Sequence, residues 1–353
     1  MTGIKDVALD VGLSIATVSR ALRGQPGVSA DNRHRIEQAA ARLGYVPSRT
    51  AANLATGRTR TVAVVVPYVS RWFFSTVVHG AEQVLSGRGY DLLLFNLAGS
   101  AEARHRVMQT HQLTKRADAV VILGLQPTPA EQTWLADHAA RVVLVGASVP
   151  TWPSVTIDDE AASVTAVAHL AALGHRRIAY VGGSAEEALD FATPRARLVG
   201  FHRAMSESGL EADPALERVG GFTVAGGLAA GHDLLDLDQP PTAVFCASDE
   251  MAIGVLRAAR DRGVAVPEQL SVVGIDDHEM AQFLDLTTVR QPVAEQGRQA
   301  ALQVLALLDE DPPEPVPARH LVLETELVVR SSTGPAPAGG AAYGIIAGRG
   351  HRS

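Results

Sequence analysis

The stretch IKDVALDVGLSIATVSRALRG, residues 4–24, decides the organisation of the N-terminal part of the chain. Its apolar side chains recur at helical spacing in two short stripes that lie on either side of Gly12. Glycine accepts the positive φ of a sharp turn, and Ser14 can cap a helix that begins directly after it. The pattern predicts two short helices joined by a turn, which is typical of a helix-turn-helix.

The second of these helices carries side chains that suit the major groove of DNA. Arg20 can form two hydrogen bonds with guanine, and Ile15 can contact a thymine methyl group. Thr17 and Ser19 can reach phosphates. The alternative is an ordinary solvent-exposed corner, because the same geometry occurs in proteins that bind no DNA. The residues of the head that we predict to contact DNA are Ile15, Ala16, Thr17, Ser19, Arg20 and Asn32.

The charge of the chain is divided unevenly along its length. The formal net charge is −7 over 353 residues, which is unusual for a protein that binds nucleic acid. Residues 1–60, however, hold nine Lys and Arg against four Asp and Glu, or +5, so the remainder carries −12. The basic segment is therefore the part that we expect on phosphate, and the acidic part should face away from it.

Composition limits the remaining classes. A content of 46% hydrophobic and 20% charged residues is ordinary for a soluble protein of two or three domains. Neither an apolar run of membrane-spanning length nor an apolar N-terminal leader is present, so we expect a cytoplasmic protein without a membrane partner. Cys246 is the single cysteine, which excludes an internal disulfide and argues against structural zinc. We expect no metal and no cofactor.

The rest of the chain predicts a different architecture. Ser29 can cap a third helix that ends at Gly44. From Thr61 onward, apolar runs such as TVAVVVP and ADAVVILGL alternate with amphipathic stretches, and the alternation restarts at RRIAYVGG. This pattern predicts an α/β core of two doubly wound subdomains with parallel sheets. In such folds a ligand binds beyond the carboxyl ends of the strands, here between the two halves.

The N-terminal stretch resembles the lactose-repressor (LacI/GalR) family of bacterial transcription regulators, whose heads typically read IKDVA..AGVS..TVSR.L. Gly3 departs from the usual threonine cap but is still an acceptable cap. The resemblance continues through GRTRTVAVVVP, SDEMAIGVLRA, LSVVGIDD, LTTVRQP and LVVRSST, over roughly residues 4–333. It implies an all-α helix-turn-helix head and a core like a type I periplasmic binding protein. The expected boundaries are a head at 1–46, a hinge helix and linker at 47–60, a core for effector binding and dimerisation at 61–333 with crossings between its lobes near 158–162, 288–293 and 318–323, and a disordered tail at 334–353.

The resemblance also assigns a role to the linker. In the family this position carries a hinge helix that orders on operator DNA, pairs with that of its dimer mate and inserts a leucine between base pairs. Leu54 matches that leucine, and the small side chain of Ala55 would let two such helices approach. A plain linker is the alternative, because so short a helix is marginal alone. The tail has no leucine heptad, so we expect a homodimer.

Six side chains near the predicted strand ends form the candidate effector site. A guanidinium and a carboxylate between aromatic walls suit a polyhydroxylated ring, because charged groups can bridge neighbouring hydroxyls. Family members contact their effectors at the positions of Arg197, Phe222 and Asp276. As alternatives, Arg197 and Asp276 could simply pair, and Phe74 and Phe222 could belong to the core. The six residues are Phe73, Phe74, Arg197, Phe222, Ser248 and Asp276.

Two departures from the family pattern bear on the ligand. Arg71 and Trp72 replace the usual Asn-Pro, and Ser248 replaces a common asparagine. Trp72 could widen the stacking surface, and Arg71 could accept an anionic group, so the ligand is expected to be a sugar or a sugar phosphate. We expect Asp249 to cap the helix that follows it.

Together these patterns predict a repressor of a carbohydrate-use operon. It would bind a palindromic operator in double-stranded DNA as a homodimer and leave it when a small effector binds. A corepressor-dependent regulator of the same family is the alternative. An enzyme is disfavoured, because GxSxG, GxxxxGK[ST], HExxH and a strand-linked GxGxxG are missing from the sequence. A periplasmic-type sugar-binding protein is disfavoured by the basic head.

Overall fold

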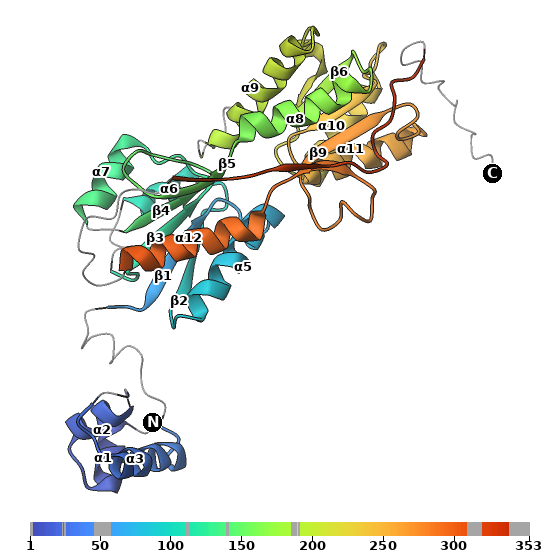
Figure 1. Cartoon of the computed structure of the whole chain (residues 1–353). Helices are drawn as coiled ribbons and strands as arrows, with labels where there is room; N and C mark the ends of the chain where they lie inside the picture. Colours follow the sequence, from blue (N-terminus) through green and yellow to red (C-terminus); the bar gives the residue numbers. More distant parts are fainter. Residues whose placement is uncertain are drawn as a thin grey trace, which may run out of the picture. The chain divides into compact units, whose positions relative to one another are not determined.

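The computed structural model describes residues 3–22, 24, 26–45, 58–109, 113, 115–138, 141–184, 189, 191–308 and 320–338. The chain divides into two units, Met1–Arg60 and Thr61–Ser353. Each unit has its own hydrophobic core. Figure 1 draws the helices of the first unit and the two lobes of the second.

In its described residues, the first unit is a bundle of three short helices. They are α1 (Ile4–Val11), α2 (Ile15–Leu22) and α3 (Ala30–Arg42). Gly12 ends α1 with φ of 67°, as predicted, and the Ser14 hydroxyl accepts a hydrogen bond of 3.1 Å from the backbone N–H of Thr17. Ser29 caps α3. Val7, Val18 and Ile36 are fully buried at the centre, so the three helices share one small core.

The second unit begins with a lobe built on a six-stranded parallel sheet, in the order β11-β5-β4-β3-β1-β2. Alternate residues of β1 pack on opposite faces of it, since Val62 and Val64 contact one core cluster and Ala63 and Val65 another. Residues of α5 and α12 cover the first face, and residues of α6 and α7 cover the second. The elements are β1 (Thr61–Val66), α5 (Trp72–Ser86), β2 (Asp91–Asn96), α6 (Ala101–Met108), β3 (Ala119–Leu123), α7 (Pro129–Asp137), β4 (Val142–Val145), β5 (Ser154–Ile157), α12 (Val293–Leu308) and β11 (His320–Leu323).

The second lobe repeats the layout with the strand order β12-β10-β9-β8-β6-β7. Its strands are parallel except β12, which pairs antiparallel with β10. The prediction of two doubly wound subdomains is therefore confirmed. The elements are α8 (Asp159–Ala172), β6 (Ile178–Gly182), α9 (Ala192–Glu207), a 3-10 turn (Pro214–Leu216), β7 (Glu217–Val219), α10 (Val224–Leu235), β8 (Ala243–Cys246), α11 (Asp249–Arg262), β9 (Ser271–Asp276), β10 (Thr287–Arg290) and β12 (Glu326–Val328).

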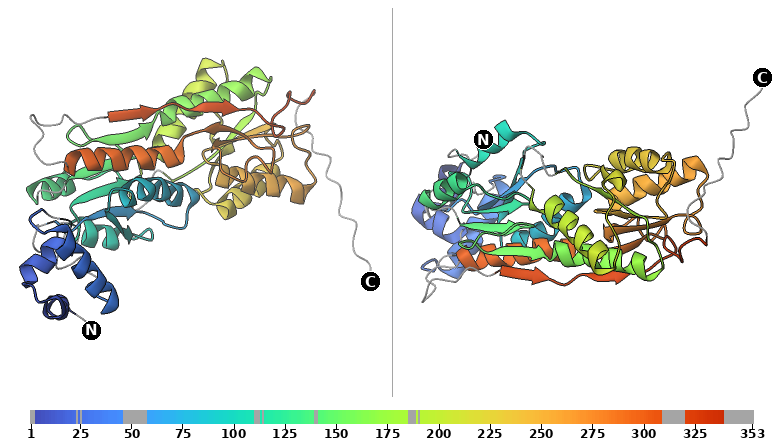
Figure 2. Two further views of the ribbon diagram at one scale, coloured as in Figure 1. Left: turned by 60° about the horizontal axis from the view of Figure 1, so that its bottom comes forward. Right: turned by 90° about the horizontal axis from the view of Figure 1, so that it is seen from above.

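The chain passes between the lobes three times. The passages lie between β5 and α8, between β10 and α12, and between β11 and β12. The third differs from the predicted range of 318–323, because His320–Leu323 itself pairs with β5 and the passage follows it. Figures 1 and 2 show β11 and β12 in red, running from one lobe into the other.

The predicted start of a disordered tail at residue 334 is wrong. The Ser332 hydroxyl donates to the carbonyl of Val272, and the backbone N–H of Ala336 donates to that of Leu173 at 2.9 Å. The carbonyl of Gly334 accepts from the buried His175, which gains a partner for its ring. These bonds attach the segment to the second lobe through Ala336, and residues 339–353 lie outside the described part of the chain.

Candidate functional site

The helix α2 presents the predicted DNA-contacting face to solvent. Val18 and Ala21 are buried against the other two helices, whereas Ile15, Ala16 and Arg20 are exposed. Thr17 and Ser19 are half-buried on the same helix, and Asn32 is half-buried in the first turn of α3. The hydroxyl of Thr17 lies 2.8 Å from that of Ser14, at the capped start of the helix. Leu54 and Ala55 lie outside the described residues.

A cavity that opens to solvent lies between the two lobes of the second unit. Both lobes supply its walls, and strand ends of both sheets meet there, because Gly124 follows β3 and Asp276 ends β9. All six side chains of the predicted effector site line it. The complete lining is Arg71, Phe73, Phe74, Gly124, Gly146, Phe191, Thr193, Pro194, Arg197, Phe222, Ser248, Glu250, Asp276 and Gln291.

Arg197, on α9, is the buried cation of the cavity, with 4% of its surface exposed. Its Nε donates a hydrogen bond of 2.8 Å to Asp159, and a terminal nitrogen donates to the carbonyl of Ala247. Asp276 lies 3.9 Å from the guanidinium. Burial acts to lower the pKa of Arg197, but Asp159 and Asp276 together raise it above its ordinary value. Arg197 therefore pairs primarily with Asp159, at the start of α8, and more loosely with Asp276.

Two carboxylates face the cavity from the second lobe. Burial raises the pKa of Asp276 to about 6, although Arg197 and a hydrogen bond from Gln291 act in the opposite direction. Burial and the charge of Asp276 raise the pKa of Glu250 to about 7, opposed by Arg71 and by the backbone N–H of Trp72. The site therefore concentrates negative charge in a place that water reaches poorly.

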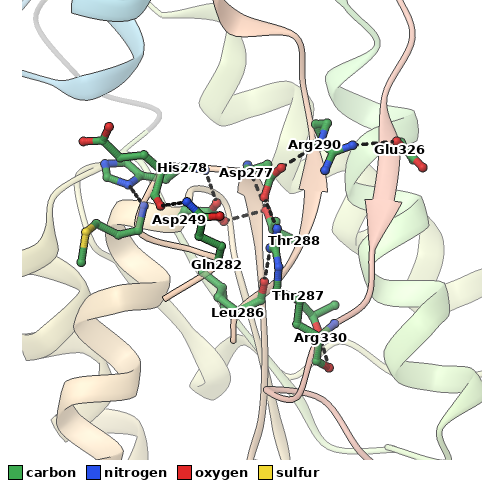
Figure 3. A network of polar contacts seen from close by, with 12 residues as sticks. Asp249, Asp277, His278, Gln282, Leu286, Thr287, Thr288, Arg290, Glu326 and Arg330 are labelled. Carbon is green, nitrogen blue, oxygen red and sulfur yellow. Dashed lines mark hydrogen bonds and ion pairs between the residues drawn. The ribbon is translucent and has the colours of Figure 1, made fainter. Parts of the chain in front are cut away.

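Ser248, and not Asp249 as expected, caps α11. The Ser248 hydroxyl accepts a hydrogen bond of 3.4 Å from the backbone N–H of Met251. Asp249 turns into the lobe instead, where it accepts from the backbone N–H of His278 at 2.8 Å and from the Thr288 hydroxyl at 2.7 Å (Figure 3). Burial and the nearby Asp276 raise its pKa to about 8.

The strand ends beneath Asp276 are fixed by a second polar cluster. Asp277 accepts hydrogen bonds from Arg290 at 2.8 Å and from Arg330 at 2.7 Å, and Arg290 also reaches Glu326 at 3.1 Å (Figure 3). These contacts join β10, β12 and the loop after β9. The backbone of Asp276 has a φ of 132°, which residues other than glycine rarely adopt, so the surrounding contacts must hold it in this conformation.

The opposite wall of the cavity is fastened by a buried ion pair of the first lobe. Arg104 on α6 donates to both carboxylate oxygens of Glu131, at 2.9 and 2.8 Å. It also donates to the carbonyl of Leu189, which belongs to the segment between β6 and α9 of the second lobe. Leu189 is buried in the first lobe, and Phe191, two residues on, bridges to Leu125 and lines the cavity.

Arg71 lines the cavity as expected, but Trp72 does not. The guanidinium of Arg71 lies 4.0 Å from the centre of the Tyr68 ring. The Trp72 ring lies 4.7 Å from that of His278 and lines a neighbouring groove instead. It therefore contributes an aromatic contact between the lobes and does not widen the stacking surface.

Sequence reasoning missed several lining residues. One of them is Glu250, two residues after the predicted Ser248. Asp159, which pairs with Arg197 but does not line the cavity, comes directly after the apolar stretch SVTID. Proximity to strand ends could therefore have indicated both. Phe191 has no such signal, because it becomes a wall residue only through the contact of its segment with the first lobe. In the described residues, no group of three or more His, Cys, Asp or Glu side chains could hold a metal ion. None of the helices within these ranges has the length and apolar character to span a bilayer.

Two protein-family models match separate parts of the chain. A model of the lacI family of bacterial regulatory proteins matches residues 3–48, and one of the periplasmic binding protein-like domain matches residues 167–333. The HTH-type transcriptional repressor CytR of Escherichia coli K12 is 36% identical over 334 residues, or 94% of this chain and 96% of that protein. The chain belongs to the lacI family. Catabolite control protein A of Priestia megaterium is 34% identical over 298 residues. The matched residues make up 83% of this chain and 89% of that protein.

Solved structures agree with this assignment to the lacI family. The lac repressor dimer bound to operator and the anti-inducer ONPF superposes with a TM-score of 0.82 at 27% identity, covering 94% of this chain and 99% of that one. The complex of the regulator CelR with cellobiose gives a TM-score of 0.69 at 32% identity, covering 94% and 100%. As a lacI family member, this protein is a DNA-binding transcriptional regulator and not an enzyme.

Proposed function

We propose that this regulator represses a carbohydrate-use operon by binding a palindromic operator as a homodimer, in the cytoplasm where the chromosome lies. The observation that carries the proposal is the cavity between the lobes, lined from both sides and connected by sequence to a basic helix-turn-helix head. A ligand that contacts both lobes binds one arrangement of them better than another, and so shifts the population.

The head supplies the DNA contacts in this proposal. Two copies of α2 would enter successive major grooves about one helical turn apart, which is why the operator should be an inverted repeat. Arg20 would read a base, and Thr17, Ser19 and Asn32 would position the head on the backbone. Leu54 and Ala55 would form the hinge contact in the minor groove at the centre of the site.

The cavity supplies the control. Phe73 and Phe74 come from the first lobe, whereas Arg197, Phe222 and Asp276 come from the second. A carbohydrate or carbohydrate derivative between them would favour the closed arrangement and change the separation of the two hinges, which would release the operator. A ligand that strengthened DNA binding instead would make the protein corepressor-dependent.

The test is selection of the full-length protein on random duplexes, followed by fluorescence anisotropy with the enriched sequence. We expect an inverted repeat, two protomers for each duplex, and an affinity at least about a thousandfold above random DNA. Equal affinity for the enriched and the shuffled duplex would contradict the proposal. Addition of candidate ligands to the bound complex gives the sign of the control.

A further inference from the structure

We propose that the cavity takes an uncharged ring compound rich in hydrogen-bond donors and rejects the phosphorylated form of the same compound, with Glu250 as a residue that determines this choice. The inference rests on the proposed effector function and deepens it. Free sugars and nucleosides share the required chemistry, because both offer several hydroxyl donors and a flat or apolar ring face.

The cations of the cavity are already engaged. Arg197 is held by Asp159 at 2.8 Å and by the carbonyl of Ala247, so a phosphate would have to compete with a half-buried carboxylate for it. Arg71 lies over the Tyr68 ring and is attracted by Glu250. A built phosphate site usually offers unopposed guanidinium or ammonium groups, or backbone N–H groups, to the phosphate oxygens.

The carboxylates of the cavity, in contrast, have capacity left. Glu250 accepts from the backbone N–H of Trp72, and Asp276 accepts from Gln291. An ionised carboxylate can accept about four hydrogen bonds, so both groups can take further donors from a ligand. Glu250 is half-buried at the wall and contacts the first lobe through Trp72, so a ligand hydroxyl or amino group at this carboxylate would meet the boundary between the lobes.

The charge around the cavity is negative in sum. The carboxylates of Asp159, Glu250 and Asp276 oppose two guanidinium groups, those of Arg71 and Arg197. The raised pKa values of Glu250 and Asp276 have a physical cause in this crowding, together with burial. A phosphate group would add a charge of about −1.5 to −2 at neutral pH, which the site would have to accommodate beside these carboxylates.

The walls fit the uncharged part of such a ligand. Phe73 and Phe74 stand on the side of the first lobe, with ring centres 5.3 Å apart in an edge-to-face arrangement. Phe191 and Phe222 line the cavity from segments of the second lobe. Aromatic rings on both sides suit the C–H face of a sugar or the face of a base.

The experiment uses the full-length protein and matched pairs of probes. Monosaccharides, disaccharides and ribonucleosides are compared with their own monophosphates by thermal shift at millimolar concentration, and then by calorimetry. We expect at least one uncharged probe to raise the Tm by several degrees and to bind about tenfold or more tightly than its phosphate. The sugar and nucleoside arms identify the source. A phosphate that binds more tightly than its parent, or a panel with no uncharged binder, overturns the proposal.

Glu250→Gln tests the assigned residue, and Glu268→Gln is the matched control, because Glu268 is an exposed glutamate of the same lobe. We expect the first variant to bind the uncharged probe about tenfold more weakly with a narrower gap to the phosphate, and the second to behave as the parent. Unchanged discrimination in Glu250→Gln would remove Glu250 from this role. Glu250→Asp keeps the charge and replaces Glu250→Gln if that variant fails to fold.

Operator affinity is measured on the same preparations without any probe. Intact preference for an inverted repeat, with no discrimination between a probe and its phosphate, counts against this inference alone. Loss of preference for an inverted repeat in the parent protein counts against the proposed function.

Discussion

Replacing Arg104 by methionine should lower the melting temperature of the two-lobed unit by about 5–8 °C. The side chains of Arg104 and Glu131 are 8% and 3% exposed, and two hydrogen bonds join them. Burial alone would raise the pKa of Glu131, but hydrogen bonds from Arg104 and Thr128 hold it below its ordinary value. Methionine keeps an unbranched chain and leaves that carboxylate uncompensated, which costs about 3–5 kcal/mol.

The conversion to temperature follows from the size of the unit. Unfolding entropy is about 2.1 cal/mol/K per residue, so a unit that runs from Thr61 to the C-terminus changes its free energy by about 0.6 kcal/mol per kelvin near its midpoint. Differential scanning calorimetry of the full-length protein gives the shift. The ligand-free protein is used, because a bound effector would add its own stabilisation.

Two further variants make this result interpretable. Arg104→Met/Glu131→Gln removes both charges and should recover more than half of the loss, because the remaining amide can still accept from Thr128. Arg106→Met is the control on the same helix, where the side chain is 57% exposed, and should change the melting temperature by about 1 °C or less. Two results would refute the stabilising role of the buried ion pair. One is a melting temperature of Arg104→Met equal to that of Arg106→Met, and the other is a melting temperature of the double variant as low as that of Arg104→Met.

The remaining predictions concern DNA, the ligand and pH. Arg20→Ala should cost about 1–3 kcal/mol at one symmetric base position in competition binding, whereas an equal loss on all sequences would indicate a phosphate contact. Leu54→Ala should reduce DNA bending in a phasing assay, and an unchanged bend would exclude the wedge. Arg197→Lys should weaken the ligand response while operator affinity in its absence stays as in the parent. The folded state keeps a proton on Asp249, because the pKa of this carboxyl is raised to about 8. The free energy of unfolding, measured by urea titration, should therefore fall as pH rises from about 4 to 8, by at most about 1.4 kcal/mol per pH unit for this group. Asp249→Asn should reduce this dependence on pH.

Local signals indicated most of the described helices and strands. Gly12, Ser14 and the apolar stripes around them indicated the helix-turn-helix, and buried parallel strands stand out as uninterrupted apolar runs. The third passage between the lobes was predicted at the wrong residues, because the stretch HLVLETELVV has the same alternation of apolar and polar residues before and after the passage. The sequence of an edge strand also does not show which strand it pairs with. The order at Gly334 depends on the distant His175, which no local pattern could reveal.

The sequence predicted the lining residues of the cavity that lie at strand ends. It did not predict those that reach the cavity through tertiary contacts. Asp276 ends β9 and Phe222 lies in the turn after β7, so topology alone brings them to the same edge of the sheet. Phe191 reaches the cavity because its segment leaves its own lobe and is held by Arg104 of the other. The primary partner of Arg197 was also missed, since Asp159 comes directly after one predicted strand and Asp276 ends another, and spacing does not rank them.

The attachment of the segment from Ser332 to Ala336 sets a limit on how the protein can be shortened or labelled. A protein that stops before Ser332 would leave the carbonyl of Val272 and the backbone N–H of Thr287 without the hydroxyl that serves both. It would also deprive the buried imidazole of His175 of one acceptor. Affinity tags and fluorophores therefore belong beyond Ala338, where they leave these hydrogen bonds of the second lobe intact.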